Sequence, residues 1–243
     1  MPRYFLELSY KGTAYHGFQV QENAPTIQAA VEQALKVLLK EPIDLTGSSR
    51  TDAGVHALQN YFHFDTELKL EQKQVYNLNA ILPSDIAIQS IKQVAPSAHC
   101  RFDAIAREYH YHIYTQKDPF FQDRGWYFPY PMDINLLNKA AELLKNHSDY
   151  TSFAKRNSQV YTHQCIIHHA IWERISPNQI KFTVSANRFL RGMVRGLVGT
   201  MVKVGREILS VEDFELILQA KDASKADFST PAQGLFLAKV IYP

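Results

Sequence analysis

The stretch from Gly47 to Ala57, GSSRTDAGVHA, places an arginine, a threonine and an aspartate side by side among small residues. A carboxylate such as Asp52 can attack an electrophilic carbon or stabilise developing positive charge, provided that a nearby cation keeps it ionised. His56, four positions further on, is a candidate acid–base partner for Asp52. No serine nucleophile elbow accompanies the pair, so a hydrolase triad has little support. The stretch therefore indicates chemistry centred on Asp52.

Candidate cations occur in the segment 187–209, NRFLRGMVRGLVGTMVKVGREIL. Its apolar residues recur at helical spacing, which predicts one long helix, and Arg188, Arg191 and Arg195 form a basic stripe along it. A solvated face is the commoner interpretation of such a stripe. Three glycines interrupt the helix: Gly192, Gly196 and Gly199. Each costs roughly 1 kcal/mol of helix propensity, and their spacing lets another backbone pack close. This favours a buried helix, in which an arginine needs an anionic partner such as Asp52.

A strand-like alternation over residues 105–115 puts Arg107, Tyr109 and Tyr111 on one face. Aromatic rings beside a cation are how many proteins hold unstacked nucleic-acid bases. The alternative is that these tyrosines fill or rim the core, as strand tyrosines commonly do. Both interpretations stay open on this pattern.

The histidine-rich run HQCIIHH does not form a convincing metal site. Strand alternation sends His163, Cys165 and His169 to one face and His168 to the other, and no second ligand pair occurs elsewhere. Half-buried polar strand residues are the commoner interpretation, so we expect no metal. The chain also lacks a Walker A motif and a dinucleotide-binding fingerprint, so no nucleotide cofactor is indicated.

Composition is that of a folded protein, with 46% apolar and 21% charged residues in a chain of 243. Only two cysteines occur, Cys100 and Cys165, which fits a reducing compartment. No secretion signal is recognisable at the N-terminus, and no apolar run approaches the roughly 20 residues needed to span a bilayer. We therefore expect a cytoplasmic protein. A formal net charge of +2 is too small to show a polyanion partner, which would need a local basic face.

Strand and helix patterns recur in two similar halves, with a restart near residues 100–105. The first half predicts strands at 3–10, 55–66 and 85–95, and helices at 26–40, with Thr26 as N-cap, and at 72–82. The second predicts strands at 105–115, 160–175, 179–186 and 234–242, and helices at 133–146, 187–209 and 210–220. Asp133 is the expected N-cap of the first of these helices. The alternation argues for an α+β (mixed α/β) architecture of two related lobes.

Five ordered blocks of the sequence resemble the tRNA pseudouridine synthase A (TruA) family, nearly from end to end. The nucleophile motif of that family, G-x-G-R-T-D-x-G-V-H-A, stands here as GSSRTDAGVHA. The other blocks are YKGTAYHGFQVQ, HCRFDAIAREYHY, FLRGMVRGLVGTMVKVG and PAQGLFLAKVIYP. Five blocks in order are far more specific than any one motif.

The resemblance implies an isomerase that converts uridine to pseudouridine in the anticodon stem-loop of tRNAs, at family positions 38, 39 and 40. It implies a pseudouridine synthase fold of two lobes, each a mainly antiparallel sheet with helices on one face. From the restart of the pattern we expect these lobes to be residues 1–103 and 104–243. The active site is then expected in the cleft between the lobes. The enzyme would need no cofactor or metal and would act as a homodimer whose subunits jointly hold the tRNA.

Residue by residue, the resemblance makes Asp52 the nucleophile and Arg195 its partner, while Arg50 assists base flipping. Tyr109 would stack on the target base, Leu235 would line the pocket and Arg191 would bind substrate. A basic wall for the tRNA is expected from a larger set: Arg50, Arg188, Arg191, Lys155, Arg156, Arg101 and Arg107.

Two positions depart from the family pattern. Ser49 stands where the nucleophile loop usually has its second glycine, and Phe18 stands where a tryptophan is usual. Neither is a reacting group, but both bear on the choice of target uridines. Two alternatives stay open, a catalytically inert tRNA-binding protein on the same scaffold and an Asp-dependent hydrolase unrelated to RNA.

Overall fold

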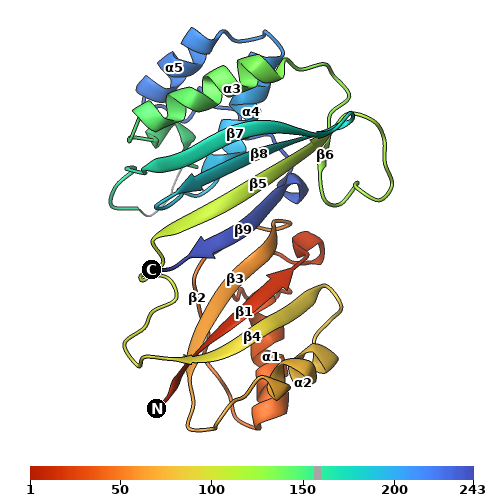
Figure 1. Cartoon of the computed structure of the whole chain (residues 1–243), viewed down its shortest axis with the longest axis vertical. Helices are drawn as coiled ribbons and strands as arrows, with labels where there is room; N and C mark the ends of the chain where they lie inside the picture. Colours follow the sequence, from red (N-terminus) through yellow and green to blue (C-terminus); the bar gives the residue numbers. More distant parts are fainter. Residues whose placement is uncertain (156–159) are drawn as a thin grey trace. The chain divides into compact units, whose positions relative to one another are not determined.

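The N-terminal strand, β1 (Arg3–Tyr10), buries alternate side chains from Tyr4 to Tyr10, as its period of two predicts. It belongs to the first of two compact units in this computed structural model (Figure 1). The structure describes residues 1–155 and 160–243. The first unit comprises residues 1–105 and 236–243, and the second comprises residues 106–235.

The first unit contains a mainly antiparallel sheet in the order β4-β1-β3-β9. Antiparallel pairing joins β1 to both β3 (His56–Asp65) and β4 (Ile86–Val94). A short strand, β2 (Thr46–Gly47), pairs with β3 in the same antiparallel sense. The last strand, β9 (Leu235–Ile241), pairs with β3 in parallel, through His56 opposite Phe236. β3 thus has partners on both sides at the end where the Asp52 loop enters it.

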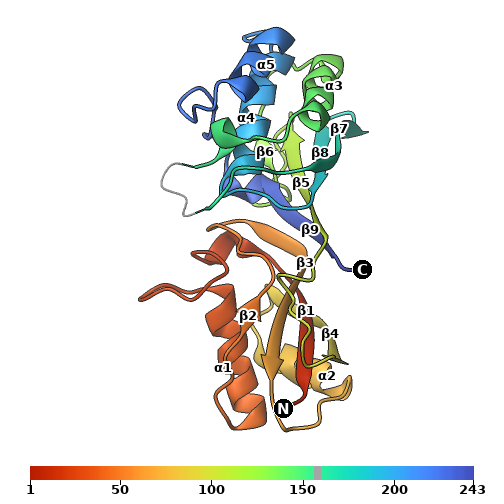
Figure 2. The same cartoon turned by 90° about the vertical axis from the view of Figure 1, so that its left-hand side faces the viewer.

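Two helices pack in this unit, α1 (Ile27–Leu39) and α2 (Lys73–Ile81). The Thr26 side chain accepts a hydrogen bond from Ala29 N, which confirms the predicted N-cap of α1. The buried face of α1 carries Ile27, Val31, Ala34 and Leu35. A 3₁₀ turn, η1 (Gly12–Ala14), follows β1. Figure 2 shows α1 running alongside the strands of the unit.

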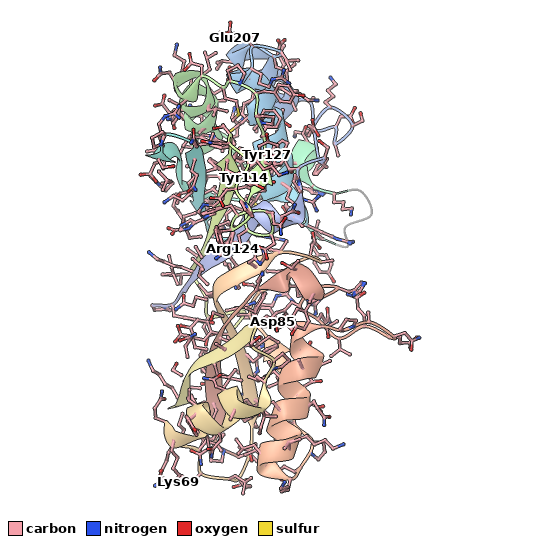
Figure 3. All side chains as sticks on the ribbon, turned by 90° about the vertical axis from the view of Figure 1, so that its right-hand side faces the viewer. Lys69, Asp85, Tyr114, Arg124, Tyr127 and Glu207 are labelled. Atoms are coloured by element: carbon pink, nitrogen blue, oxygen red, sulfur yellow. The ribbon has the colours of Figure 1, made fainter. Side chains whose placement is uncertain are left out.

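The second unit has the antiparallel order β5 (Ala106–Tyr114), β8 (Gln179–Ala186) and β7 (Ile167–Ser176). A short strand, β6 (Trp126–Tyr127), pairs with β5 in parallel. The ring centroids of Tyr114 and Tyr127 lie 5.4 Å apart where these two strands meet (Figure 3). Both units are therefore mainly antiparallel, as predicted.

Three helices pack together in the second unit: α3 (Ile134–Leu143), α4 (Met193–Gly205) and α5 (Val211–Gln219) (Figure 1). Asp133 caps α3 by accepting from Asn135 N, as predicted. Short 3₁₀ turns occur at three further places: η2 (Leu144–Asn146), η3 (Thr151–Phe153) and η4 (Ala232–Gly234). No helix in the described part of the chain is both long and apolar enough to cross a membrane.

Two predicted elements are shorter than expected. α4 begins at Met193 and not near residue 187, because Gly192 adopts a φ of 74° that ends regular helix geometry on its N-terminal side. Arg188 and Arg191 therefore precede the helix, and the predicted helical stripe of three arginines is wrong. β7 likewise begins at Ile167, so His163 and Cys165 do not share a strand face with His169.

The units divide the chain at residues 105 and 106, and the last eight residues lie with the first unit. The expected division lies between residues 103 and 104, with the C-terminal strand in the second lobe. Hydrogen bonds explain the assignment of this strand. Ile105 N donates to Ile241 O, Val240 N donates to Gln59 Oε1, and the Tyr242 hydroxyl donates to Cys100 O.

One local contact is repeated in the two units. Asn79 on α2 donates to Ile88 O at 2.9 Å and accepts from Ile88 N at 2.7 Å, which clamps the helix to β4. Asn138 on α3 makes the same pair of hydrogen bonds to the backbone of Trp172 on β7, at 3.0 and 2.8 Å. In each unit a helix asparagine thus satisfies both backbone groups of one strand residue. This supports the two related lobes predicted from the pattern of elements.

Candidate active site

Asp52 lies in the loop between β2 and β3, half-buried between the buried residues Thr51 and Val55. Val55 N donates to Asp52 O at 3.2 Å, which closes a tight turn at the carboxylate. Gly54 adopts a φ of 77° within this turn and donates its N–H to Tyr15 O. The backbone on both sides of Asp52 is thus held by hydrogen bonds, and the residue itself is half-buried.

Beneath the loop, the side chain of Asn60 is fully buried and makes four hydrogen bonds. Its Nδ2 donates to Ser49 O at 2.9 Å and to the Tyr10 hydroxyl at 3.1 Å. Its Oδ1 accepts from Ser48 Oγ at 3.0 Å and from Tyr61 N at 2.9 Å. One amide therefore ties the loop backbone to β3 and, through Tyr10, to β1.

This polar network reaches the residue next to Asp52. The Tyr10 hydroxyl lies 2.8 Å from Thr51 Oγ1, and both groups are buried. Thr51 O accepts from Phe18 N at 3.1 Å. Thr51 is therefore held through both its side chain and its backbone. These contacts restrict movement of the backbone at the adjacent Asp52.

Ser49 and Phe18, the two residues that depart from the family pattern, pack against this loop. Ser49 is buried, with its hydroxyl 3.3 Å from Ser48 Oγ. The buried ring of Phe18 stacks on Phe62 with centroids 4.6 Å apart. It lies so close to Gly47 that a Cβ there would come within 2.2 Å of the ring. Both substituted residues thus pack beneath Asp52, where they help to set the position of its loop.

His56 has a structural role at the start of β3. Its ring is buried, and its Nδ1 accepts a hydrogen bond from Gly12 N at 3.0 Å, which requires that nitrogen to be unprotonated. The ring also packs against Phe236 with centroids 4.6 Å apart. These contacts join η1 and β9 to the strand that follows the loop.

Tyr15, whose backbone carbonyl accepts the hydrogen bond from Gly54 N, is itself fixed through its side chain. Its hydroxyl donates to Asp85 Oδ1 at 2.6 Å, and Asp85 is labelled in Figure 3. Burial, reinforced by the hydrogen bond to Asp85, raises the pKa of Tyr15 well above its ordinary value. Tyr15 therefore stays a neutral hydrogen-bond donor over the physiological range.

In the second unit, Tyr109 and Tyr111 differ in depth although they share one face of β5. Tyr109 is half-buried, and its ring meets that of Phe189 edge to face, with centroids 5.0 Å apart. Tyr111 is fully buried, its hydroxyl donates to Pro231 O at 2.7 Å, and burial raises its pKa. Of the two interpretations left open for these tyrosines, the core one therefore holds for Tyr111.

Arg195 lies in the first turn of α4 and is half-buried. Its Nε donates to Thr230 O at 2.7 Å. Leu235, which lines the predicted pocket, is buried at the start of β9. Among the predicted site residues, Arg50 and Asp52 belong to the first unit, and Tyr109, Arg191, Arg195 and Leu235 to the second.

The expected basic wall consists of surface residues of mixed exposure. Four of its members are exposed: Arg50, Arg101, Lys155 and Arg191. Arg107 and Arg188 are half-buried, and Arg156 lies outside the described residues. Lys155 N donates to Arg191 O at 2.9 Å, so these two basic residues lie side by side. Among the described residues, no three His, Cys, Asp or Glu side chains are grouped so that they could hold a metal ion.

Two supporting residues were missed by sequence analysis, Asn60 and Thr230. For Asn60 a signal was present, because strand alternation puts it on the same buried face as Phe62 and Phe64. A polar residue on such a face must find hydrogen-bond partners. Thr230 carries no comparable local signal, since its partner Arg195 lies 35 residues earlier in the chain.

Comparisons with known proteins agree with one another. A family model described as tRNA pseudouridine synthase matches residues 8–103 and 140–243. The chain is 42% identical over 245 residues to "tRNA pseudouridine synthase A" of Parabacteroides distasonis, covering 100% of this chain and 97% of that protein. It is 44% identical over 244 residues to the protein of the same name from Bacteroides fragilis, with 99% and 96% covered. The Staphylococcus aureus protein of that name is 34% identical over 241 residues, with 98% and 91% covered.

The network beneath the loop predicts the effect of Asn60→Leu. Removing the amide leaves buried partners unsatisfied, at a cost of about 1–3 kcal/mol each, and lets the Asp52 loop move. We expect lower thermal stability. We also expect the single-turnover rate of pseudouridine formation to fall by about 10- to 100-fold, since a shift of a catalytic group by about 1 Å can have that effect. Binding of tRNA, measured by filter retention, should stay near the wild-type level.

Asn79→Leu is the matched control, because it removes the hydrogen bonds to Ile88 in the same unit without touching the loop. It should lower stability and leave the single-turnover rate unchanged. Equal rates for Asn60→Leu and Asn79→Leu would show that Asn60 does not set the geometry of the loop.

Proposed function

Because the chain belongs to the tRNA pseudouridine synthase family and is an isomerase, we propose that it converts uridines in the anticodon stem-loop of tRNAs, at positions 38, 39 and 40. The observation that carries this proposal is the loop of Asp52. Its motif resembles the family's nucleophile motif except at Ser49, and the half-buried Asp52 lies on a backbone that hydrogen bonds hold on both sides.

The isomerisation breaks the N-glycosidic bond, turns the uracil ring and joins the sugar carbon to C5 of the base. The proton on C5 is then released to solvent, and N1 gains a proton. No electrons are exchanged with a second molecule and no group is transferred, so we propose no cofactor. A carboxylate that attacks or stabilises the separated sugar or base is sufficient for the covalent chemistry.

We assign that carboxylate to Asp52 and its counter-ion to Arg195. A guanidinium next to a carboxylate keeps it ionised, as nucleophilic attack requires. Extrusion of the target nucleotide costs a few kcal/mol of stacking energy. The exposed side chain of Arg50, two residues before Asp52, is suited to fill the vacated space or to hold the displaced backbone.

Tyr109 is proposed to stack on the extruded uracil, and the buried side chain of Leu235 to line the pocket. Support for Tyr109 comes from its partial exposure and from Phe189, which fixes the ring edge-on. Arg191, with Lys155 beside it, is proposed to contact tRNA phosphates. An enzyme that acts on tRNA works where tRNA is found, so we place it in the cytoplasm.

Mapping the modified positions tests the proposed substrate site. Transcripts of a tRNA with uridine at positions 38, 39 and 40 are incubated with the enzyme, treated with a carbodiimide and read by primer extension. We expect new pseudouridine stops at those uridines, and none in a control transcript with cytidine at all three. Stops elsewhere in the tRNA, with none in the anticodon stem-loop, would contradict the proposed site.

The stacking role of Tyr109 predicts a graded pair of variants. Tyr109→Phe keeps the aromatic face and should keep tRNA affinity. Tyr109→Leu removes the face and should lose roughly 1–3 kcal/mol of stacking on the flipped base, seen as slower single-turnover formation of pseudouridine. If Tyr109→Leu were as fast as the wild type, the ring would have to be reassigned to local packing against Phe189.

We also propose that the enzyme is a homodimer whose subunits jointly hold one tRNA. Analytical ultracentrifugation at micromolar concentration should then give the mass of a dimer. Affinity for tRNA should fall steeply as salt rises, because several phosphate contacts release counter-ions. A fully active monomer under these conditions would contradict the dimer.

A further inference from the structure

The segment Asp227–Thr230, called the strap below, lies directly against α4. A Cβ built on Gly199 would lie 2.3 Å from Asp227 O, and one built on Gly196 would lie 2.8 Å from the Phe228 ring. Any side chain at these two positions would displace the strap or the helix. Gly199 thus allows the close backbone approach that its spacing predicts, whereas Gly196 makes room for the Phe228 ring.

The first residue of the strap is fixed to the middle of α4 by charge and by hydrogen bonds. Lys203 Nζ lies 3.0 Å from Asp227 Oδ2, and Asp227 N donates to Thr200 Oγ1 at 3.0 Å. Although burial opposes it, hydrogen bonds from Ser229 and Lys203 hold the pKa of Asp227 below its ordinary value. Asp227 therefore stays ionised and paired near neutral pH.

The last residue of the strap, Thr230, exchanges two hydrogen bonds with Arg195. Arg195 Nε donates to Thr230 O at 2.7 Å, and Thr230 Oγ1 donates to Arg195 O at 2.8 Å. Thr230 is fully buried. The hydroxyl thus fixes the strap to the backbone of Arg195, and the strap carbonyl fixes the side chain of the same arginine.

Beyond Thr230 the chain is anchored to β5. Pro231 O accepts from the Tyr111 hydroxyl, and a Cβ on Gly234 would lie 2.7 Å from the Tyr111 ring. Tyr111 shares its strand face with Tyr109. Within the second unit, the strand that carries Tyr109 therefore also anchors the segment that holds Arg195.

A guanidinium is planar, so a hydrogen bond at Nε sets the direction of the whole group. The remaining four N–H groups lie on the two terminal nitrogens, the edge that binds a carboxylate or phosphate with two parallel hydrogen bonds. A lysine side chain has only its terminal ammonium group. It has no separate N–H group, like that at Nε of arginine, through which a neighbour could orient the charged end. Orientation through Nε thus prepares the terminal edge for one oxyanion.

We propose that Thr230 is a positioning residue for the reaction, acting through Arg195 by fixing the plane of its guanidinium. The inference rests on the proposed role of Arg195 as the counter-ion of the catalytic carboxylate. Thr230 itself touches neither substrate nor reacting atoms. Its effect should therefore appear in the chemical step and depend on the guanidinium.

The test uses Thr230→Val, which keeps the shape and removes the hydroxyl, and Thr230→Ser, which keeps the hydroxyl. Single-turnover formation of pseudouridine and tRNA affinity are measured with the full-length enzyme, together with thermal stability. Thr230→Val should slow the chemical step by about 10- to 100-fold with tRNA affinity near wild type, since displacement of a catalytic group has effects of this order. Thr230→Ser should restore most of the rate.

A control variant and a double-mutant cycle separate positioning from loss of stability. Thr26→Val removes another buried threonine hydroxyl, the N-cap of α1, and should lower thermal stability without slowing the chemical step. In an Arg195→Lys background, Thr230→Val should cost less than about 2-fold in rate, because the group that it orients is already gone.

The two proposals fail in different ways. If Arg195→Lys is slow but Thr230→Val is as fast as the wild type, or if Thr230→Val costs the same in both backgrounds, the positioning role is overturned and Arg195 keeps its role. If Arg195→Lys is as fast as the wild type, the role of Arg195 fails, and the inference about Thr230 fails with it.

Discussion

The Asp52 loop depends on one buried amide, that of Asn60, which makes hydrogen bonds to Ser49 O, Ser48 Oγ, the Tyr10 hydroxyl and Tyr61 N. A loop that brings a carboxylate to the surface of a β-sheet must bury polar backbone next to apolar strands. Such groups are costly unless each has a partner. Asn60 supplies these partners, and Phe18 and Ser49 fill the space around them. The loop that carries the half-buried Asp52 is thus supported by hydrogen bonds from an uncharged side chain.

In the second unit, hydrogen bonds also hold a charged residue, the cation Arg195. Arg195 emerges from the first turn of α4, where Gly192 begins the helix, and its Nε is taken by the carbonyl of Thr230. In the first unit hydrogen bonds hold the backbone around Asp52, and in the second unit a backbone carbonyl holds the side chain of Arg195. Orientation before the substrate arrives lowers the cost of reorganisation in the transition state. In the proposed isomerisation, preorganisation of this kind acts together with the carboxylate of Asp52.

Features set by local sequence were predicted well. Thr26 and Asp133 cap their helices because capping depends on neighbouring backbone N–H groups. Strand alternation gave the face of Tyr109 and Tyr111 but not their depth, since depth is decided by what packs on that face, here η4 and Pro231. The start of α4 was missed because an apolar pattern continues through Gly192, whose left-handed backbone the pattern does not reveal. Contacts between segments that are distant in the chain, such as that of Thr230 with Arg195, cannot be predicted from the spacing of residues in the sequence. The candidate site residues could be identified from sequence motifs, whereas the residues that support them could be identified only from the structure.

We propose that the carboxylate of Asp52 is required for the chemical step, whereas tRNA binding depends mainly on other residues. A tRNA transcript labelled with tritium at C5 of uridine tests it most directly, because the label must pass to water when the base rejoins through C5. Asp52→Asn keeps the size of the side chain and removes its charge. We expect this variant to fold, as thermal unfolding would show, to bind tRNA with near wild-type affinity and to release no tritium. Release of tritium at an appreciable rate by the folded variant would contradict the account, because the isomerisation would then proceed without the carboxylate.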